Sequence, residues 1–143
     1  MAYDWSDSLL EVDWEELSQL YKIAPLGHKP PEALKLAFSN SLYRCFVREQ
    51  GRLVGVGRAL ADGVDCSYIC DIAVHPDQQG SGLGKQIVAR LIEMSRGHKK
   101  IILYAVPGRE GLYAKFGFKP MTTAMAIFAD PAQAVERGLI IDT

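Results

Sequence analysis

The sequence has 143 residues, of which 48% are hydrophobic and 23% are charged, and its formal net charge is −1 at pH 7. These values are typical of a soluble globular protein, and the length predicts one domain over residues 1–143. They argue against general nucleic-acid binding, which requires a basic surface, and against a membrane span, because no apolar run approaches the required roughly 20 residues. The N-terminus lacks the pattern of a signal peptide, so a cytoplasmic location is expected.

The cysteines and histidines do not have the spacing of a metal site. Only Cys66 and Cys70 lie close together, and His28, His75 and His98 share no ligand-like spacing with them. The pattern indicates reduced thiols in a cytosolic protein, and no metal is expected.

Two helices are predicted in the N-terminal part of the chain. The first covers residues 13–24, because Asp13 and Glu16 form a capping-box-like pair before a run with helical apolar spacing. Three prolines and a glycine within residues 25–31 end this helix, and a second helix is predicted over residues 32–41.

The middle of the chain reads as a meander of antiparallel strands. Residues 42–63 contain two strand-like runs joined at Gln50 and Gly51. A turn signal then leads to a third strand at residues 66–74.

The remaining part of the chain alternates helices and strands. The predicted elements are a helix at about 82–95, a strand at 99–106, a short helix at 109–116, a strand at 122–128 and a helical turn within 130–143 closed by Gly138. A strand–helix–strand unit whose second strand is apolar predicts a parallel pair. The predicted fold class is therefore α+β, with a mixed, mostly antiparallel sheet.

Three glycines, Gly80, Gly82 and Gly84, stand between the third strand and the following helix. A Walker-type loop is excluded, because Gln79 stands where its first glycine belongs and Gln86 where its Ser or Thr belongs. The dinucleotide fingerprint G-x-G-x-x-G is excluded because the third glycine comes one place early. The pattern that remains is Q-x-x-G-x-G.

This segment resembles motif A of the GNAT superfamily, the GCN5-related N-acetyltransferases. In that family a strand ending in V-x-P, here Val74 and Pro76, precedes the loop, and the later stretch "GLYAKFGF" matches the family's L-Y-x-x-x-G-F. The order of elements also fits, so the resemblance covers nearly the whole chain and is greatest to small single-domain bacterial members and plant arylamine-type relatives. It implies helices on both faces of the sheet and a splayed parallel strand pair.

The resemblance implies acetyl-coenzyme A as co-substrate. Its diphosphate would lie on backbone N–H groups at the start of a helix, which have no intrahelical partners. The residues expected to contribute are Gln79, Gly80, Ser81, Gly82, Leu83, Gly84 and Lys85. The pantetheine arm would pair with the backbone of Ile72, Ala73 and Val74 in the manner of an added strand. The alternative is a glycine-rich turn that serves helix–sheet packing alone.

The family also suggests catalytic residues. A backbone N–H near the strand end, here that of Val74, would stabilise the oxyanion, and Tyr113 would protonate the departing thiolate and contact the coenzyme. The alternative for Tyr113 is simple packing on the core. Asp71 is a candidate base or a binder of a cationic substrate, and the alternative is a structural pair with Arg58.

The acceptor is less well specified. In the family the region between the first two helices shapes the acceptor site, which points to Tyr21 and His28 as substrate contacts, although His28 also suits a surface loop. Pro107 stands where many relatives have an asparagine that contacts the coenzyme, which puts that contact in doubt. The expected activity is N-acetylation of a small-molecule primary amine. A coenzyme-binding sensor without turnover and a protein N-acetyltransferase are the alternatives, and a homodimer is left open by analogy.

Overall fold

The computed structural model describes residues 2–142, which form two compact units, one ending at Leu103 and one beginning at Tyr104. The expectation of a single domain stays a prediction. Within the described residues no helix combines the length and the apolar character of a membrane span.

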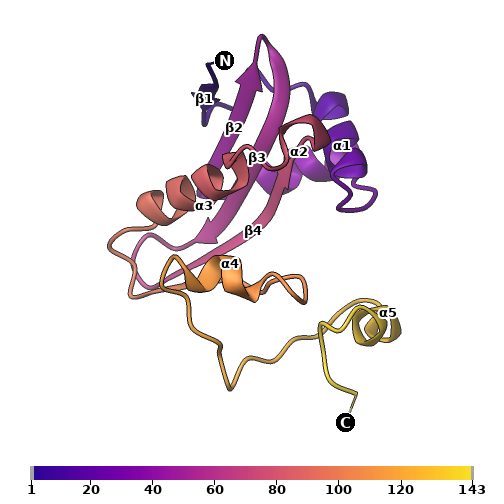
Figure 1. Cartoon of the computed structure of the whole chain (residues 1–143), viewed down its shortest axis with the longest axis vertical. Helices are drawn as coiled ribbons and strands as arrows, with labels where there is room; N and C mark the ends of the chain where they lie inside the picture. The colour runs from indigo at the N-terminus through magenta and orange to yellow at the C-terminus, as the bar shows by residue number, and fades with distance from the viewer. Residues whose placement is uncertain (1, 143) are drawn as a thin grey trace. The chain divides into compact units, whose positions relative to one another are not determined.

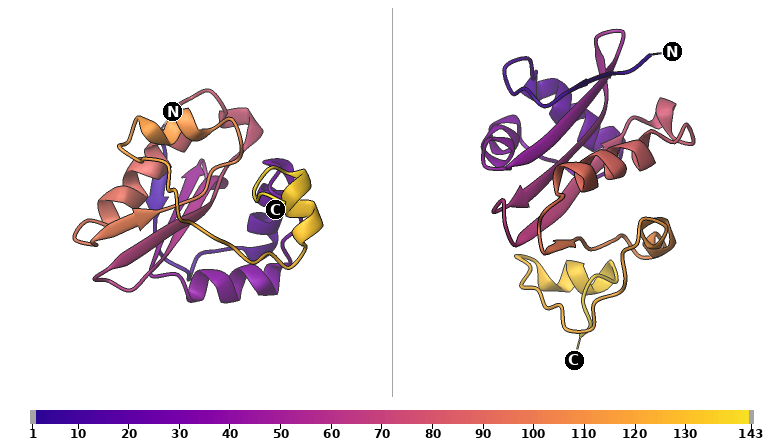
Figure 2. Two further views of the ribbon diagram at one scale, coloured as in Figure 1. Left: turned by 90° about the horizontal axis from the view of Figure 1, so that it is seen from below. Right: turned by 90° about the vertical axis from the view of Figure 1, so that its left-hand side faces the viewer.

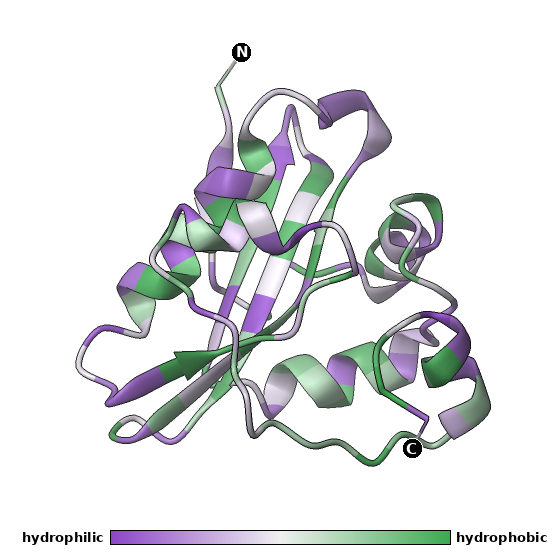
Figure 3. Cartoon of the chain, turned by 60° about the horizontal axis from the view of Figure 1, so that its bottom comes forward, coloured by the Kyte–Doolittle hydropathy of each residue, from purple (hydrophilic) through white to green (hydrophobic). Residues whose placement is uncertain are grey.

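The first unit is built on a five-stranded sheet in the order β1-β2-β3-β4-β5 (Figure 1). Neighbouring strands are antiparallel except for the parallel pair β4–β5. The strands are β1 (Asp4–Ser6), β2 (Tyr43–Glu49), β3 (Arg52–Ala61), β4 (Cys66–Val74) and β5 (Lys100–Ile102). This confirms the mixed, mostly antiparallel sheet, and Figure 3 shows hydrophobic and hydrophilic positions interspersed along its strands.

Helices cover both faces of this sheet, as predicted (Figure 2). One face carries α1 (Trp14–Ile23) and α2 (Pro31–Ser39), and the other carries α3 (Leu83–Met94), which follows the short 3-10 helix η1 (Pro76–Gln78). On the α3 side, a Cβ atom at Gly55 or Gly57 would lie 2.8 Å from a side chain of α3. These glycines therefore let α3 pack directly on β3.

The α1–α2 face contains a hydrophobic core around Phe38, Phe46 and Val56. Full burial of one such side chain contributes roughly 1.5–3 kcal/mol to folding. Asp13 caps α1, because its carboxylate accepts the amide of Glu16 at 3.2 Å. The Glu16 carboxylate does not complete the predicted capping box; it accepts the amide of Leu53 at 3.1 Å and so connects α1 to β3.

β4 departs from regular pairing in its second half. Cys70 pairs with Arg58 and Ala73 pairs with Val56, so one residue of β3 faces two residues of β4, Asp71 and Ile72. Asp71 has a positive φ of 56°. This geometry is a β-bulge, in which an extra residue bends the strand and redirects its backbone groups.

The parallel pair is short. Its last partners are Tyr68 and Ile102, although the sequence predicted a strand over residues 99–106. Beyond Tyr68, β4 is therefore paired within the first unit only to β3.

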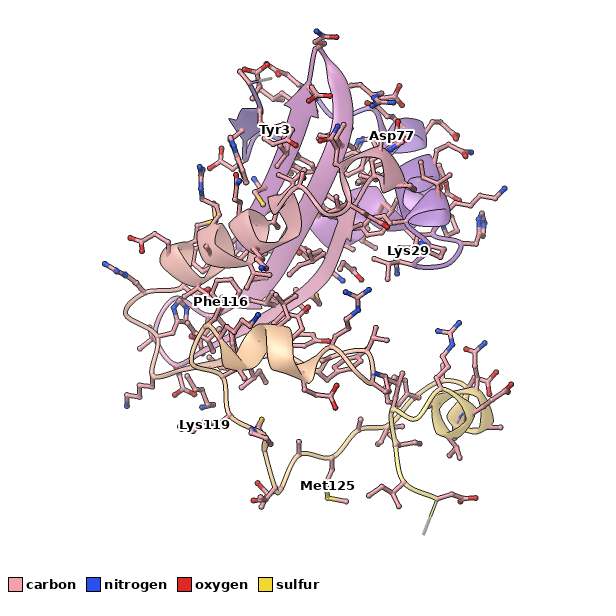
Figure 4. The ribbon with its side chains drawn as sticks, in the orientation of Figure 1. Tyr3, Lys29, Asp77, Phe116, Lys119 and Met125 are labelled. Carbon is pink, nitrogen blue, oxygen red and sulfur yellow. The ribbon has the colours of Figure 1, made fainter. Side chains whose placement is uncertain are left out.

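The second unit contains two short helices, α4 (Glu110–Ala114) and α5 (Pro131–Glu136). Gly138 closes α5 with a φ of 73°, as predicted. The predicted strand at 122–128 is wrong: this segment has no ladder partner among the described residues. The side chains of Met125, labelled in Figure 4, and of Ile127 are exposed. Its alternating pattern suits a strand, but a strand forms only against a neighbour.

Candidate functional site

The loop between β4 and α3 exposes bare backbone. Gly80 and Gly82 have φ values of 84° and 88°, a conformation that glycine adopts without steric cost. A Cβ atom at either position would meet no atom within 4 Å. The glycines are thus required by the backbone conformation and leave the surface open to a ligand.

The first turn of α3 offers N–H groups to that surface. The first helical hydrogen bond of α3 runs from the Gln86 amide to the Gly82 carbonyl, at 3.1 Å. The preceding amides of Gly84 and Lys85 have no partner within the helix, and the side chain of Lys85 is exposed beside them. Together with the helix dipole, these groups favour an anion.

Side chains distant in sequence hold this loop in place. The hydroxyl of Tyr3 donates to the side-chain oxygen of Gln78, whose amide nitrogen donates to Glu49 at 3.1 Å. The side-chain nitrogen of Gln79 donates to the carbonyl of Ala24 at the end of α1, at 3.5 Å. The sequence gives no sign of the roles of Tyr3, Gln78 and Glu49, because no local pattern connects these residues.

The second half of β4 presents an open edge within the first unit. The His75 amide donates to the Val54 carbonyl at 2.8 Å. Because successive amides along a strand point in opposite directions, the N–H of Ala73 points toward β3, whereas those of Val74 and Ile72 point away from it. The β5 ladder has already ended here, so these two amides are available to an added chain.

Asp71 lies at the bulge among charged groups. One carboxylate oxygen, Oδ2, accepts from Arg58 Nε at 2.8 Å, and the other, Oδ1, lies 3.6 Å from Lys29 Nζ. Arg58 also donates to the Ser41 hydroxyl at 3.2 Å. The expected pair with Arg58 is confirmed, and the sequence analysis missed Lys29.

Tyr21 supports the bulge from α1. Its side chain is buried, and its hydroxyl donates to the backbone carbonyl of Asp71 at 2.7 Å. Burial, and then the charge of Asp71, raise the pKa of Tyr21 well above its ordinary value, so the phenol stays protonated. The structure thus brings Tyr21 and Asp71 together, whereas His28 is exposed in the loop after α1.

Tyr113 lies in α4 of the second unit. Its carbonyl accepts the amides of Phe116 and Phe118, and its ring meets that of Phe118 edge-on at 6.2 Å. Burial raises the pKa of Tyr113, so its hydroxyl remains a proton donor at neutral pH.

All three cysteines have free thiols. Burial raises the pKa of Cys45 to about 12 and that of Cys70 to about 11, so both are protonated at neutral pH. Among the described residues no group of three or more His, Cys, Asp and Glu side chains is arranged to hold a metal.

Comparison with protein families identifies the fold. The model of the acetyltransferase (GNAT) family matches residues 7–118. The chain belongs to this family. Solved acetyltransferase structures are similar: an acetyltransferase of Trypanosoma brucei has a TM-score of 0.73 at 25% identity, covering 89% of this chain and 99% of that one. The ribosomal-protein-S18-alanine N-acetyltransferase of Escherichia coli has a TM-score of 0.73 at 20% identity, with coverage of 85% and 80%, and shows the shared fold.

The sequence of this GNAT chain is also similar to those of curated relatives, of which two are described. An N-acetyltransferase of Prochlorococcus marinus named ycf52-like is 32% identical over 113 residues, which are 75% of this chain and 63% of the relative. Serotonin N-acetyltransferase 2, chloroplastic, of Oryza sativa is 41% identical over 113 residues, 75% of this chain and 56% of the relative. The chain therefore spans less than two thirds of the length of these relatives. A cytoplasmic location and a homodimer stay predictions.

Proposed function

We propose that this chain is an acetyl-coenzyme A-dependent N-acetyltransferase that acts on a primary amine of a small molecule. The observation that carries the proposal is the second half of β4, where a bulge and an open edge are followed, after η1 and the glycine loop, by the start of α3. An extended arm with amide groups fits an open strand edge, and a diphosphate fits a helix start. Few ligands other than coenzyme A combine these two parts.

The residues of this surface fit such a ligand. The bare glycines Gly80 and Gly82 and the amides of Gly84 and Lys85 would bind the diphosphate. Ile72 would bind the pantetheine arm through its outward amide and Val74 through its outward carbonyl, with Ala73 holding the strand to β3. Gln79, Ser81 and Leu83 would line the rest of the loop. Their own amides already donate within it, to Pro76, Gln78 and Ser81. When bound, acetyl-coenzyme A supplies the acetyl thioester.

Two groups of the chain would assist acyl transfer. The N–H of Val74 would donate to the oxygen that gains negative charge, an interaction that grows stronger in the transition state. The hydroxyl of Tyr113, kept protonated by its raised pKa, would give a proton to the departing sulfur.

The acceptor amine would lie beside the bulge. The carboxylate of Asp71 would bind a cationic amine or take up its proton through water, and Tyr21 would fix the position of Asp71 through the backbone. Relatives named for serotonin and for glucosamine 6-phosphate support a small-molecule acceptor. His28 is exposed in the loop that follows α1, the helix of Tyr21, and would be available for contact with a substrate.

Thiol release from acetyl-coenzyme A, measured with a panel of amines, tests the proposal. Aryl- and alkylamines, polyamines and amino acids should include at least one acceptor with saturable turnover, whereas peptides with free N-termini should be poorer.

The variant Tyr113→Phe should lower turnover by about 10²-fold or more while coenzyme binding is retained. Tyr43→Phe, in β2, is the matched control. Coenzyme binding without turnover for every amine would contradict the proposal and favour a sensor.

A further inference from the structure

Lys29 is held in an environment that suits an ammonium group. Its Nζ lies 3.6 Å from Asp71 Oδ1 and 5.5 Å from the centroid of the Tyr21 ring. A carboxylate together with an aromatic face binds a cation through both charge and ring electrons. The Lys29 side chain is 30% exposed, so it is also open to solvent (Figure 4).

The backbone of Lys29 is fixed as well. The hydroxyl of Ser18, a buried residue of α1, donates to the Lys29 carbonyl at 2.6 Å. Pro30 follows directly and forms the N-cap of α2, and the proline ring restricts the backbone there. Lys29 is thus positioned from both sides, unlike Lys22 and Lys35, which are exposed on the flanking helices.

This position lies beside the strand edge along which the acetyl-bearing arm would bind. Asp71, which holds the Lys29 ammonium, is the bulge residue immediately before Ile72. The Ile72 amide points to the open edge, where the arm would bind under the proposed function. The chain therefore presents one of its own primary amines where an external acceptor amine is expected.

We propose that Lys29 fills the acceptor position from within the chain and is itself acetylated when no external amine is present. This inference rests on the proposed function. The Lys29 ammonium loses one proton to solvent, and the neutral Nζ forms a bond to the thioester carbonyl carbon. The carbon–sulfur bond breaks, the sulfur leaves with its electron pair and takes up a proton, and Nζ loses its second proton. The products are acetyl-Lys29, the free thiol and one proton.

Acetylation changes the charge of the acceptor site. Acetyl-Lys29 has no ammonium, so its ion pair with Asp71 Oδ1 is lost, whereas Arg58 still pairs with Oδ2. The free oxygen is then available to an external cationic amine. Modified protein should therefore have a lower KM for such an amine than unmodified protein.

Mass spectrometry of the full chain incubated with acetyl-coenzyme A, with no amine added, tests self-acetylation. One acetyl group should map to Lys29 and form at least about tenfold faster than at Lys22 or Lys35, because Lys29 is already positioned. The fraction of chains acetylated per unit time should not depend on protein concentration, as for an intramolecular reaction. Lys29→Arg should leave the protein unmodified. Equal acetylation of the three lysines, or a first-order rate constant that rises with protein concentration, would overturn the proposal.

The same experiment separates this inference from the proposed function. Thiol release with external amines but no acetyl-Lys29 would overturn the inference and leave the function standing. No thiol release with any amine, together with unmodified Lys29, would overturn both.

A measurement without coenzyme tests the ammonium site directly. Lys29→Ala should bind butylammonium, detected as NMR shifts at the Asp71 and Ile72 amides, because the probe replaces the missing side chain. The natural chain, with its site filled, should show no such shifts, nor should Lys29→Ala combined with Asp71→Asn. A melting temperature close to that of the natural chain verifies folding of each variant. Equal binding of butylammonium to the natural chain and to Lys29→Ala would overturn the proposal.

Discussion

The two halves of β4 differ in how they are paired. Cys66–Tyr68 have a strand on each side, and the buried hydroxyl of Ser67 bonds to that of Ser95 at 2.8 Å. Asp71–Val74 have a strand on one side, a bulge and a charged cluster. In the first half, Ser67 and Tyr68 pair on both sides, with β3 and with β5. In the second half, the amides of Ile72 and Val74 have no partner strand within the unit. A ligand can therefore form hydrogen bonds with them.

The largest expected effect comes from removing one amide of the open half. Val74→Pro deletes an N–H that points away from β3, so turnover should fall by about 10²-fold, the effect of losing one oxyanion donor. Ala73→Pro deletes an N–H that points into the ladder and should instead destabilise the sheet. Steady-state kinetics and thermal unfolding of both variants measure the difference. Full activity in Val74→Pro would contradict the assignment.

The charged cluster gives the next largest effect. Asp71→Asn keeps a side chain that tolerates the positive φ at the bulge, but it removes the charge that pairs with Arg58 and Lys29. We expect a loss of about 1–3 kcal/mol in the free energy of unfolding and a rise in KM for cationic amines. Urea unfolding and kinetics measure the two effects. An unchanged KM would show that the carboxylate does not bind the acceptor.

A change in the closed half should affect stability alone. The Ser95 hydroxyl donates to the Leu91 carbonyl, so the Ser67 hydroxyl is the donor in the Ser67–Ser95 bond. Ser67→Ala removes this bond and should cost about 0.5–1.5 kcal/mol in the free energy of unfolding. The kcat and KM for acetyl-coenzyme A should be unchanged. A change in either would remove the proposed distinction between the two halves.

Replacing Cys70, next to the bulge, should have the smallest effect on the free energy of unfolding at neutral pH. Burial raises its pKa from 9.0 to about 11. In the unfolded chain the thiol ionises near pH 9, so its contribution to stability is complete below pH 9 and is lost as the pH rises toward 11. Cys70→Ala should therefore unfold with a weaker pH dependence between pH 9 and 11. Urea unfolding at a series of pH values measures this, and an unchanged dependence would contradict it.

Features set by neighbouring residues could be predicted from the sequence. The Asp13 cap, the glycine loop and the alternation of the central strands depend on short-range patterns, and the structure has them where they were expected. β1 has three residues and therefore too little periodicity to detect. The strand at 122–128 was predicted wrongly because its pattern does not reveal whether a partner strand is available.

At the site, too, the features set by neighbouring residues could be predicted and those that depend on distant residues could not. Motif A residues are local and could be found, and the pair of Arg58 with Asp71 could be inferred from adjacent strands. The bulge could not, because only the backbone angle of Asp71 reveals it. The contacts of Lys29 with Asp71 and of Tyr3 with Gln78 join residues far apart in the sequence, and no spacing rule predicts them.

The most direct test of the central claim is a map of backbone amide NMR shifts on addition of coenzyme A. We predict that the amides of Ile72 and Val74 and those from Gly80 to Lys85 shift together and saturably, while those of Cys66–Tyr68 do not. Saturable binding that leaves the Ile72, Val74 and loop amides unchanged would contradict the account.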